Sequence, residues 1–191
     1  EISLGLVGSE MCIRDSIIQV DTDNEGAAEK MTTLLIGKGF RRFAFLVKDM
    51  SYNVDRKRHE GFCRALIKNG ISEKDQLFYN GSIRMEFLDA IIENIISKKV
   101  ECIICGDDEI CTMVMSRLQA EGYRIPKDVA IASLYNSTNL DCYSPAVTAV
   151  SVAASQMGGT AVRQLIQRLR GENYEKKTML DYDILFRKST N

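Results

Sequence analysis

The chain has 191 residues, 45% of them hydrophobic and 27% charged, and its formal net charge at pH 7 is -1. This length suits one globular domain or two small lobes, and the composition excludes disordered and low-complexity chains. The near-zero charge argues against a domain that binds nucleic acid through phosphate contacts. The apolar runs are far shorter than the roughly 20 residues that a membrane-spanning helix needs.

The first 16 residues differ in character from the rest of the chain. The string from Val7 to Ser16 resembles translated sequencing-adapter read-through, so we expect residues 1–16 not to be native sequence. The alternative is an ordinary strand and loop from Ile2 to Gly8. The first interpretation implies a longer protein that begins upstream. This start contains no basic segment followed by an apolar core of the length that a signal peptide requires.

From residue 17 onward, strand-like and helical segments alternate. We expect strands, in chain order, at residues 17–20, 42–47, 76–79, 102–105, 129–132, 147–152 and 179–186. We expect helices between them at residues 23–38, 55–70, 84–97, 107–122 and 156–170. Strands separated by helices predict βαβ units, and therefore an α/β protein with parallel sheet.

Local signals support several of these elements. Asp23 and Asn24 are suited to cap the helix that follows them. Residues 42–47 are apolar enough to form a strand that is buried on both faces. The segment 84–97 places five apolar side chains on one stripe at helical spacing. The helix from residue 55 is expected to stop at Gly70 because glycine favours helix ends.

The six cysteines do not indicate a disulfide framework. Most lie inside apolar runs, where a free cysteine behaves as a small hydrophobic residue, so we expect a reducing, cytoplasmic compartment. Cys102 and Cys105 have the spacing of a redox pair, but both fall in a predicted strand and we expect them in the core. The single histidine, His59, gives no basis for a metal site, and we expect neither a metal nor a cofactor.

Three acids, Asp107, Asp108 and Glu109, stand where a predicted strand ends and a helix begins. Acids at a helix start suit the helix dipole, and Asp107 is a plausible N-cap. The same position is also where open α/β sheets bind ligands, and carboxylates there can accept hydrogen bonds from sugar hydroxyls. Both interpretations remain open from the sequence alone.

A basic run, Arg56 to His59, occupies the first turns of the next helix. Cations at a helix N-terminus oppose the dipole, so a purely structural choice would favour acids there. One interpretation is a solvated charge run. The other is an arginine that points into a cleft, where its planar fork can bind a polyol or a carboxylate.

Seven short motifs occur in an order that resembles the effector-binding domain of the lactose/galactose-repressor family of bacterial transcription regulators. The resemblance covers residues 20–191, nearly the whole chain. The motifs are Asp23-Asn24 with Gly39-Phe40-Arg41; Arg-x-x-Gly-Phe at 58–62 with Ala65-Leu66; the strand end at 107–111; Gly-x-x-Ile-Pro-x-Asp-Val at 122–129; Pro-x-Val-Thr at 145–148; the helix at 157–172; and Arg-x-Ser-Thr at 187–190.

The resemblance implies two hinged parallel-sheet lobes of the type I periplasmic-binding-protein-like fold, with the first lobe incomplete. Residues 17–40 and 149–177 are then expected in the N-terminal lobe, and residues 41–148 in the C-terminal lobe. Residues 178–191 are expected to place a final strand and tail on the C-terminal lobe. The DNA-binding headpiece and the first part of the N-terminal lobe are expected to be absent from this chain.

The resemblance also implies a set of effector-binding residues. Arg58 matches the family's effector-binding arginine, and Asp107 matches its ligand-contacting residue at the strand end. Asp23 and Asn24 are expected on the cleft side of the other lobe. The family commonly has an effector-binding aspartate after the strand 129–132, where this sequence has Tyr135 followed by Asn136. A phenol can stack on a sugar face but cannot chelate two hydroxyls, so this departure puts the usual sugar in doubt.

The function implied is allosteric regulation of transcription. A sugar or other small polar metabolite would bind between the lobes and change the affinity of a homodimeric regulator, expected to be a repressor, for operator DNA. The DNA contact would be made through the absent headpiece, with no membrane involved. One alternative is a secreted sugar-binding protein of a transport system, which the free cysteines disfavour. Another is an α/β enzyme, for which no nucleophile or acid/base pair is recognisable; we expect no catalysis.

Overall fold

The computed structural model describes residues 17–81 and 85–191. The expectation for residues 1–16 therefore lies outside the described residues. Within the described ranges the strands form two sheets. A large sheet has the order β3-β2-β4-β5-β6-β8, and a small sheet pairs β1 with β7. All pairings are parallel except that of β6 with β8.

The bounds of the elements follow the alternation expected from the sequence. The strands are β1 Gln19–Thr22, β2 Phe43–Val47, β3 Leu77–Asn80, β4 Cys102–Cys105, β5 Ala130–Ser133, β6 Thr148–Val152, β7 Lys177–Leu180 and β8 Tyr182–Leu185. The helices are α1 Asn24–Gly37, α2 Asn53–Lys68, α3 Met85–Ser97, α4 Asp108–Ala120, α5 Thr138–Cys142 and α6 Ala154–Leu169. The short helix α5 was not expected from the sequence.

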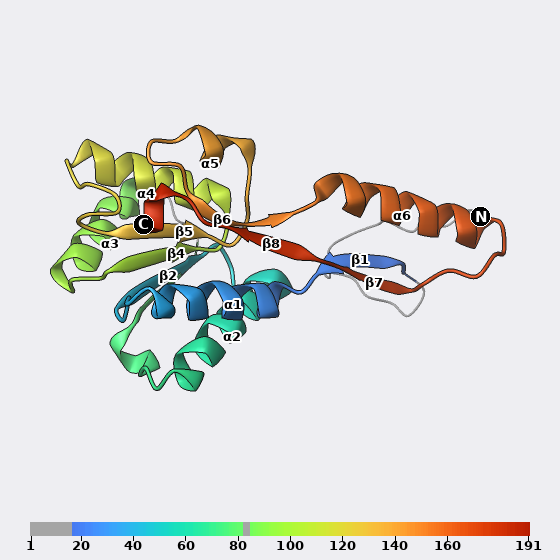
Figure 1. Ribbon diagram of the computed structural model, residues 1–191, viewed down its shortest axis with the longest axis horizontal. Helices are drawn as coiled ribbons and strands as arrows, with labels where there is room; N and C mark the ends of the chain where they lie inside the picture. The colour runs from blue at the N-terminus through green and yellow to red at the C-terminus, as the bar shows by residue number, and fades with distance from the viewer. Residues whose placement is uncertain (1–16, 82–84) are drawn as a thin grey trace.

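The large sheet lies between two helical layers, with α3, α4 and α5 on one face and α1 and α2 on the other (Figure 1). Every residue of β2, β4 and β5 is buried, which confirms a strand covered on both faces over Phe43–Val47, one residue shorter than expected. Cys102 and Cys105 are fully buried on opposite faces of β4, as expected of core cysteines. Parallel strands need this double cover because helical crossovers lie on both faces.

Helix α1 does not lie where the expected division of the chain puts it. Residues 17–40 were assigned to one lobe and residues 41–148 to the other, but α1 packs against α2 and the large sheet. Its apolar side chains, among them Met31 and Leu35, share a core with Phe43 and Phe45. The helices approach closely because α2 has Gly61 at the contact, where a β-carbon would collide with the Glu25 carbonyl oxygen.

A second correction concerns the C-terminal strand. One strand was expected over residues 179–186, but the chain forms two short strands. β7 pairs with β1 in the small sheet, and β8 pairs with β6 in the large sheet. Residues 178–180 therefore lie with β1 and not on the large sheet. Helix α6 lies beside this small sheet, away from the layers around the large one (Figure 1).

Candidate functional site

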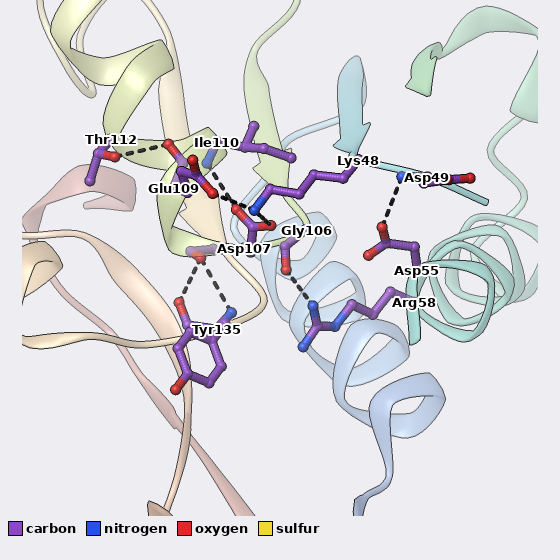
Figure 2. Close-up of polar contacts among 11 residues, drawn as sticks. Lys48, Asp49, Asp55, Arg58, Gly106, Asp107, Glu109, Ile110, Thr112 and Tyr135 are labelled. Atoms are coloured by element: carbon purple, nitrogen blue, oxygen red, sulfur yellow. Dashed lines mark hydrogen bonds and ion pairs between the residues drawn. The ribbon is translucent and has the colours of Figure 1, made fainter. Parts of the chain in front are cut away.

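Three of the residues singled out from the sequence, Arg58, Asp107 and Tyr135, lie at the edge where β2, β4 and β5 end (Figure 2). Lys48 follows β2, Gly106 and Asp107 follow β4, and Tyr135 comes shortly after β5. Parallel strands bring these ends together at one edge of the sheet, which is where open α/β folds bind ligands. The N-terminal halves of α1 and α2 add Asn24 and Arg58 to the same edge.

Arg58 links α2 to the start of α1 and to the segment that follows β4. Its Nη1 donates to the Gly106 carbonyl oxygen at 2.7 Å, and its Nε donates to Asn24 Oδ1 at 3.2 Å. Burial lowers the pKa of Arg58, and the negative charges of Asp55 and Asp107 oppose that effect. A guanidinium stays protonated in proteins, so Arg58 presents a fixed positive charge at this edge.

Asp107 has partners for both carboxylate oxygens. Oδ1 accepts the Ile110 backbone N–H at 2.9 Å, which makes Asp107 the N-cap of α4 as the sequence indicated. Oδ2 lies 3.0 Å from Lys48 Nζ. The capping interpretation is therefore confirmed, whereas a direct contact between Asp107 and an effector stays a prediction.

Sequence reasoning missed Lys48, which the structure places at the centre of this edge. Its ammonium group contacts the carboxylates of Asp107 and Glu109. Partial burial by itself would lower the pKa of Lys48, but the hydrogen bonds that its ammonium group donates to these two acids, together with their negative charges, outweigh burial and raise the pKa. Glu109 lies 61 residues away in the sequence, so no local pattern could have indicated the pair.

Asp55 was also missed. It lies in the first turn of α2, is 6% exposed, and accepts the Asp49 backbone N–H at 3.1 Å. Burial raises the pKa of Asp55, although the hydrogen bond from Asp49 and the charge of Arg58 act in the opposite direction. The available signal was an acid one helical turn before Arg58, inside a run otherwise dominated by basic residues.

Asn24 and Asp23 have different roles. Asn24 accepts the Arg58 hydrogen bond and donates through Nδ2 to the Thr22 carbonyl oxygen at 3.1 Å. Asp23 is exposed and caps α1 by accepting the Gly26 N–H at 2.8 Å. Asn24 is thus part of the cluster around Arg58, whereas the contacts of Asp23 are those of an N-cap. Both belong to the end of a helix that packs on the large sheet.

The side chains of Tyr135 and Asn136 also lie in different surroundings. Tyr135 is 42% exposed, and its backbone is fixed by the Ser133 hydroxyl, which accepts the Tyr135 N–H and donates to the Tyr135 carbonyl oxygen. Figure 2 shows the ring on the same side of the sheet edge as the Arg58 guanidinium. Asn136 Oδ1 instead accepts from Arg187 Nη1 at 3.0 Å, so its side chain is engaged by the C-terminal tail.

Other features of the described residues carry no site. No group of three or more His, Cys, Asp or Glu side chains could hold a metal ion there, and no described helix is long and apolar enough to cross a membrane. His59 packs its ring 4.3 Å from that of Phe78. A pocket of about 680 Å³ lies at the opposite end of the strands, and four of its charged lining residues form two ion pairs, Arg42 with Glu101 and Arg124 with Asp128.

Comparison with known proteins places this arrangement in a family. Residues 32–190 match the family model described as periplasmic binding protein-like domain. The HTH-type transcriptional repressor PurR of Erwinia tasmaniensis is 26% identical over 79% of this chain and 45% of its own length. The HTH-type transcriptional regulator CelR of Thermobifida fusca is 26% identical over 92% of this chain and 52% of its own length.

Solved structures of transcription regulators have the same fold as this chain. A transcriptional regulator CelR–cellobiose complex superposes with a TM-score of 0.82 at 26% identity, covering 95% of this chain and 57% of that one. The transcription regulator CcpA of Lactococcus lactis shares the fold with a TM-score of 0.85 at 24% identity, covering 98% and 68%. The chain spans about half the length of the curated relatives it matches. These relatives are transcription regulators, and the chain itself belongs to the periplasmic binding protein-like domain family.

Proposed function

We propose that this chain is the effector-sensing part of a bacterial DNA-binding transcription regulator that acts as a repressor. A sugar or another small polar metabolite binds at the edge formed by the ends of β2, β4 and β5, between two lobes. The observation that carries this proposal is the position of Arg58. Among the contacts between described residues it uses two of the five N–H donors of a guanidinium, so three remain for a ligand.

The effector class follows from the groups beside Arg58. The exposed ring of Tyr135 offers an apolar face on which a sugar ring can stack, and its hydroxyl offers one further hydrogen bond. It cannot provide the two acceptor oxygens of an aspartate. A relative in this fold has been solved with cellobiose, which supports a saccharide as the first ligand to test. We therefore propose an effector held by ring stacking and by Arg58.

Regulation requires that effector binding favour one orientation of the lobes. Contacts made in only one orientation change the balance between the two, and couplings of this kind are typically about 1–3 kcal/mol. In a homodimer, that change would alter the spacing of two DNA-binding headpieces and hence the affinity for operator DNA. The helix-turn-helix regulators among the relatives, which are about twice as long as this chain, support a headpiece in the complete protein. Such a regulator acts in the cytoplasm.

The proposal is tested by sequencing the source DNA upstream of the codon for Ile17. A basic helix-turn-helix segment and the rest of the first lobe, in frame with this chain, are the expected result. A signal peptide in frame would instead indicate a secreted sugar-binding protein of a transport system. The names of the relatives disfavour that alternative. Operator binding by the complete protein, measured with and without cellobiose, then tests regulation itself.

A further inference from the structure

We propose that Asp55 is a positioning residue for the effector site, where its carboxylate fixes the segment after β2 and orients Arg58. This inference rests on the proposed function, because it concerns the geometry of the same site. The side chain of Asp55 accepts a hydrogen bond from Asp49, a residue that we do not assign to effector contact. Its effect on binding would therefore be exerted through Lys48 and Arg58.

The hydrogen bonds around Asp55 explain how it fixes this segment. Asp55 Oδ2 accepts the Asp49 N–H at 3.1 Å, and so ties the residue that follows Lys48 to the first turn of α2. Asp49 in turn accepts the Ser51 N–H at 2.8 Å through its own side chain. The backbone of Lys48 is thereby held where its ammonium group reaches Asp107 (Figure 2).

The charges around Asp55 explain how it acts on Arg58. On its own helix, Asp55 and Arg58 are three residues apart, so they lie on neighbouring positions of one face. From the segment after β2, the Asp49 backbone N–H donates a hydrogen bond that favours the charged form of Asp55. From the end of β4, Asp107 opposes that charge. Among the acids whose negative charges stabilise the Arg58 cation, Asp55 has the largest effect.

The ionised carboxylate of Asp55 does not stabilise the folded chain. The pKa of Asp55 is raised by burial, so the folded state favours its protonated form relative to the unfolded state. Its contribution to folding is complete below the unfolded pKa and is lost as the pH rises through the raised folded pKa. At pH 7 the charge therefore costs stability. Asp55→Asn, which keeps an acceptor oxygen for Asp49, should leave the melting temperature unchanged or raise it.

Nuclear magnetic resonance tests the positioning without any effector. In the wild-type chain the Asp49 amide and the Arg58 Nε–H signals should shift together with pH as Asp55 titrates. In Asp55→Asn both titrations should disappear at that pH. Asp75→Asn, which removes an exposed carboxylate from the turn before β3, should leave them unchanged. Titrations that persist in Asp55→Asn would overturn the proposal, because the signals would then report a group other than Asp55.

Binding of cellobiose by the complete protein is the second measurement. Asp55→Asn should weaken it about tenfold at pH 7, equivalent to about 1.4 kcal/mol, while the melting temperature does not fall. Wild-type affinity should approach the variant's value as the pH falls through the pKa of Asp55. A lower melting temperature with unchanged affinity would assign Asp55 a purely structural role. If cellobiose and related neutral saccharides fail to bind the wild type, the proposed effector class fails, and the resonance titrations alone decide the role of Asp55.

Discussion

Replacing Arg58 by alanine tests the candidate site most directly. The change removes the hydrogen bonds to Gly106 and Asn24 together with the three donors proposed for the effector. A hydrogen bond that involves a charged group contributes about 1.5–3 kcal/mol. Loss of one such bond to the effector predicts a dissociation constant about one to two decades higher, since each 1.4 kcal/mol is about tenfold.

Titration calorimetry with cellobiose and a panel of neutral mono- and disaccharides measures this difference. Arg56→Ala is the matched control, because Arg56 lies on the same helix and makes only local, exposed contacts, an ion pair with Glu60 at 3.8 Å and a hydrogen bond to Asn53. Such pairs contribute at most a few tenths of a kcal/mol, so the control should bind as the wild type does. Arg58→Lys keeps the charge without the planar fork and should fall between the two.

Arg58→Ala also removes a positive charge that stabilises the buried Asp55 carboxylate, so circular dichroism is needed to separate loss of binding from loss of fold. A folded Arg58→Ala chain whose affinity equals that of Arg56→Ala would refute the assignment of Arg58 to the effector site.

Three further results are expected. Gly61→Ala should lower the free energy of unfolding by about 1–3 kcal/mol in denaturant titrations, because its β-carbon collides with a backbone oxygen of α1, whereas Gly37→Ala, which meets open space, should not. Equal effects of the two changes would contradict the close approach of α1 and α2. In saccharide titrations, Tyr135→Phe should keep most of the affinity and Tyr135→Ala should lose it, because the ring supplies the stacking; the reverse order would exclude stacking. Hydrogen bonds from Arg124 lower the pKa of Asp128 to about 2. Any advantage in melting temperature of the wild type over Asp128→Asn should therefore be present at pH 5 and disappear as the pH falls from about 4 to about 2; an advantage that persists below pH 2 would contradict this assignment.

Most helices and strands of the large sheet were predictable because their signals are local. The apolar run of β2 indicates double burial, and Gly70 and Gly122 adopt φ values of 67° and 85° just beyond the helices that they end. Helix caps are equally local, since Asp23 and Asp107 each accept from an amide three residues on. These features follow from neighbours in the sequence and need no knowledge of the tertiary fold.

The candidate site was predictable only in part. Arg58 and Asp107 stand in recognisable motifs, and the structure brings them to one edge. Lys48 and Asp55 carry no motif, because what singles them out is a partner or a burial that only folding creates. Asn136 was predicted as a site residue from its position after β5, but its side chain is engaged by Arg187, 51 residues away.

The sequence by itself determined most of the segments that are helices and strands, because hydrophobic period and capping act over a few residues. The tertiary structure decided which layer each element joins. Helix α1 packs on the large sheet through its apolar side chains, and Gly61 lets α2 approach α1 closely. Residues 177–185 divide because β7 pairs with β1 while β8 pairs with β6. Such partners are chosen by contacts between distant segments, and a local pattern does not encode them.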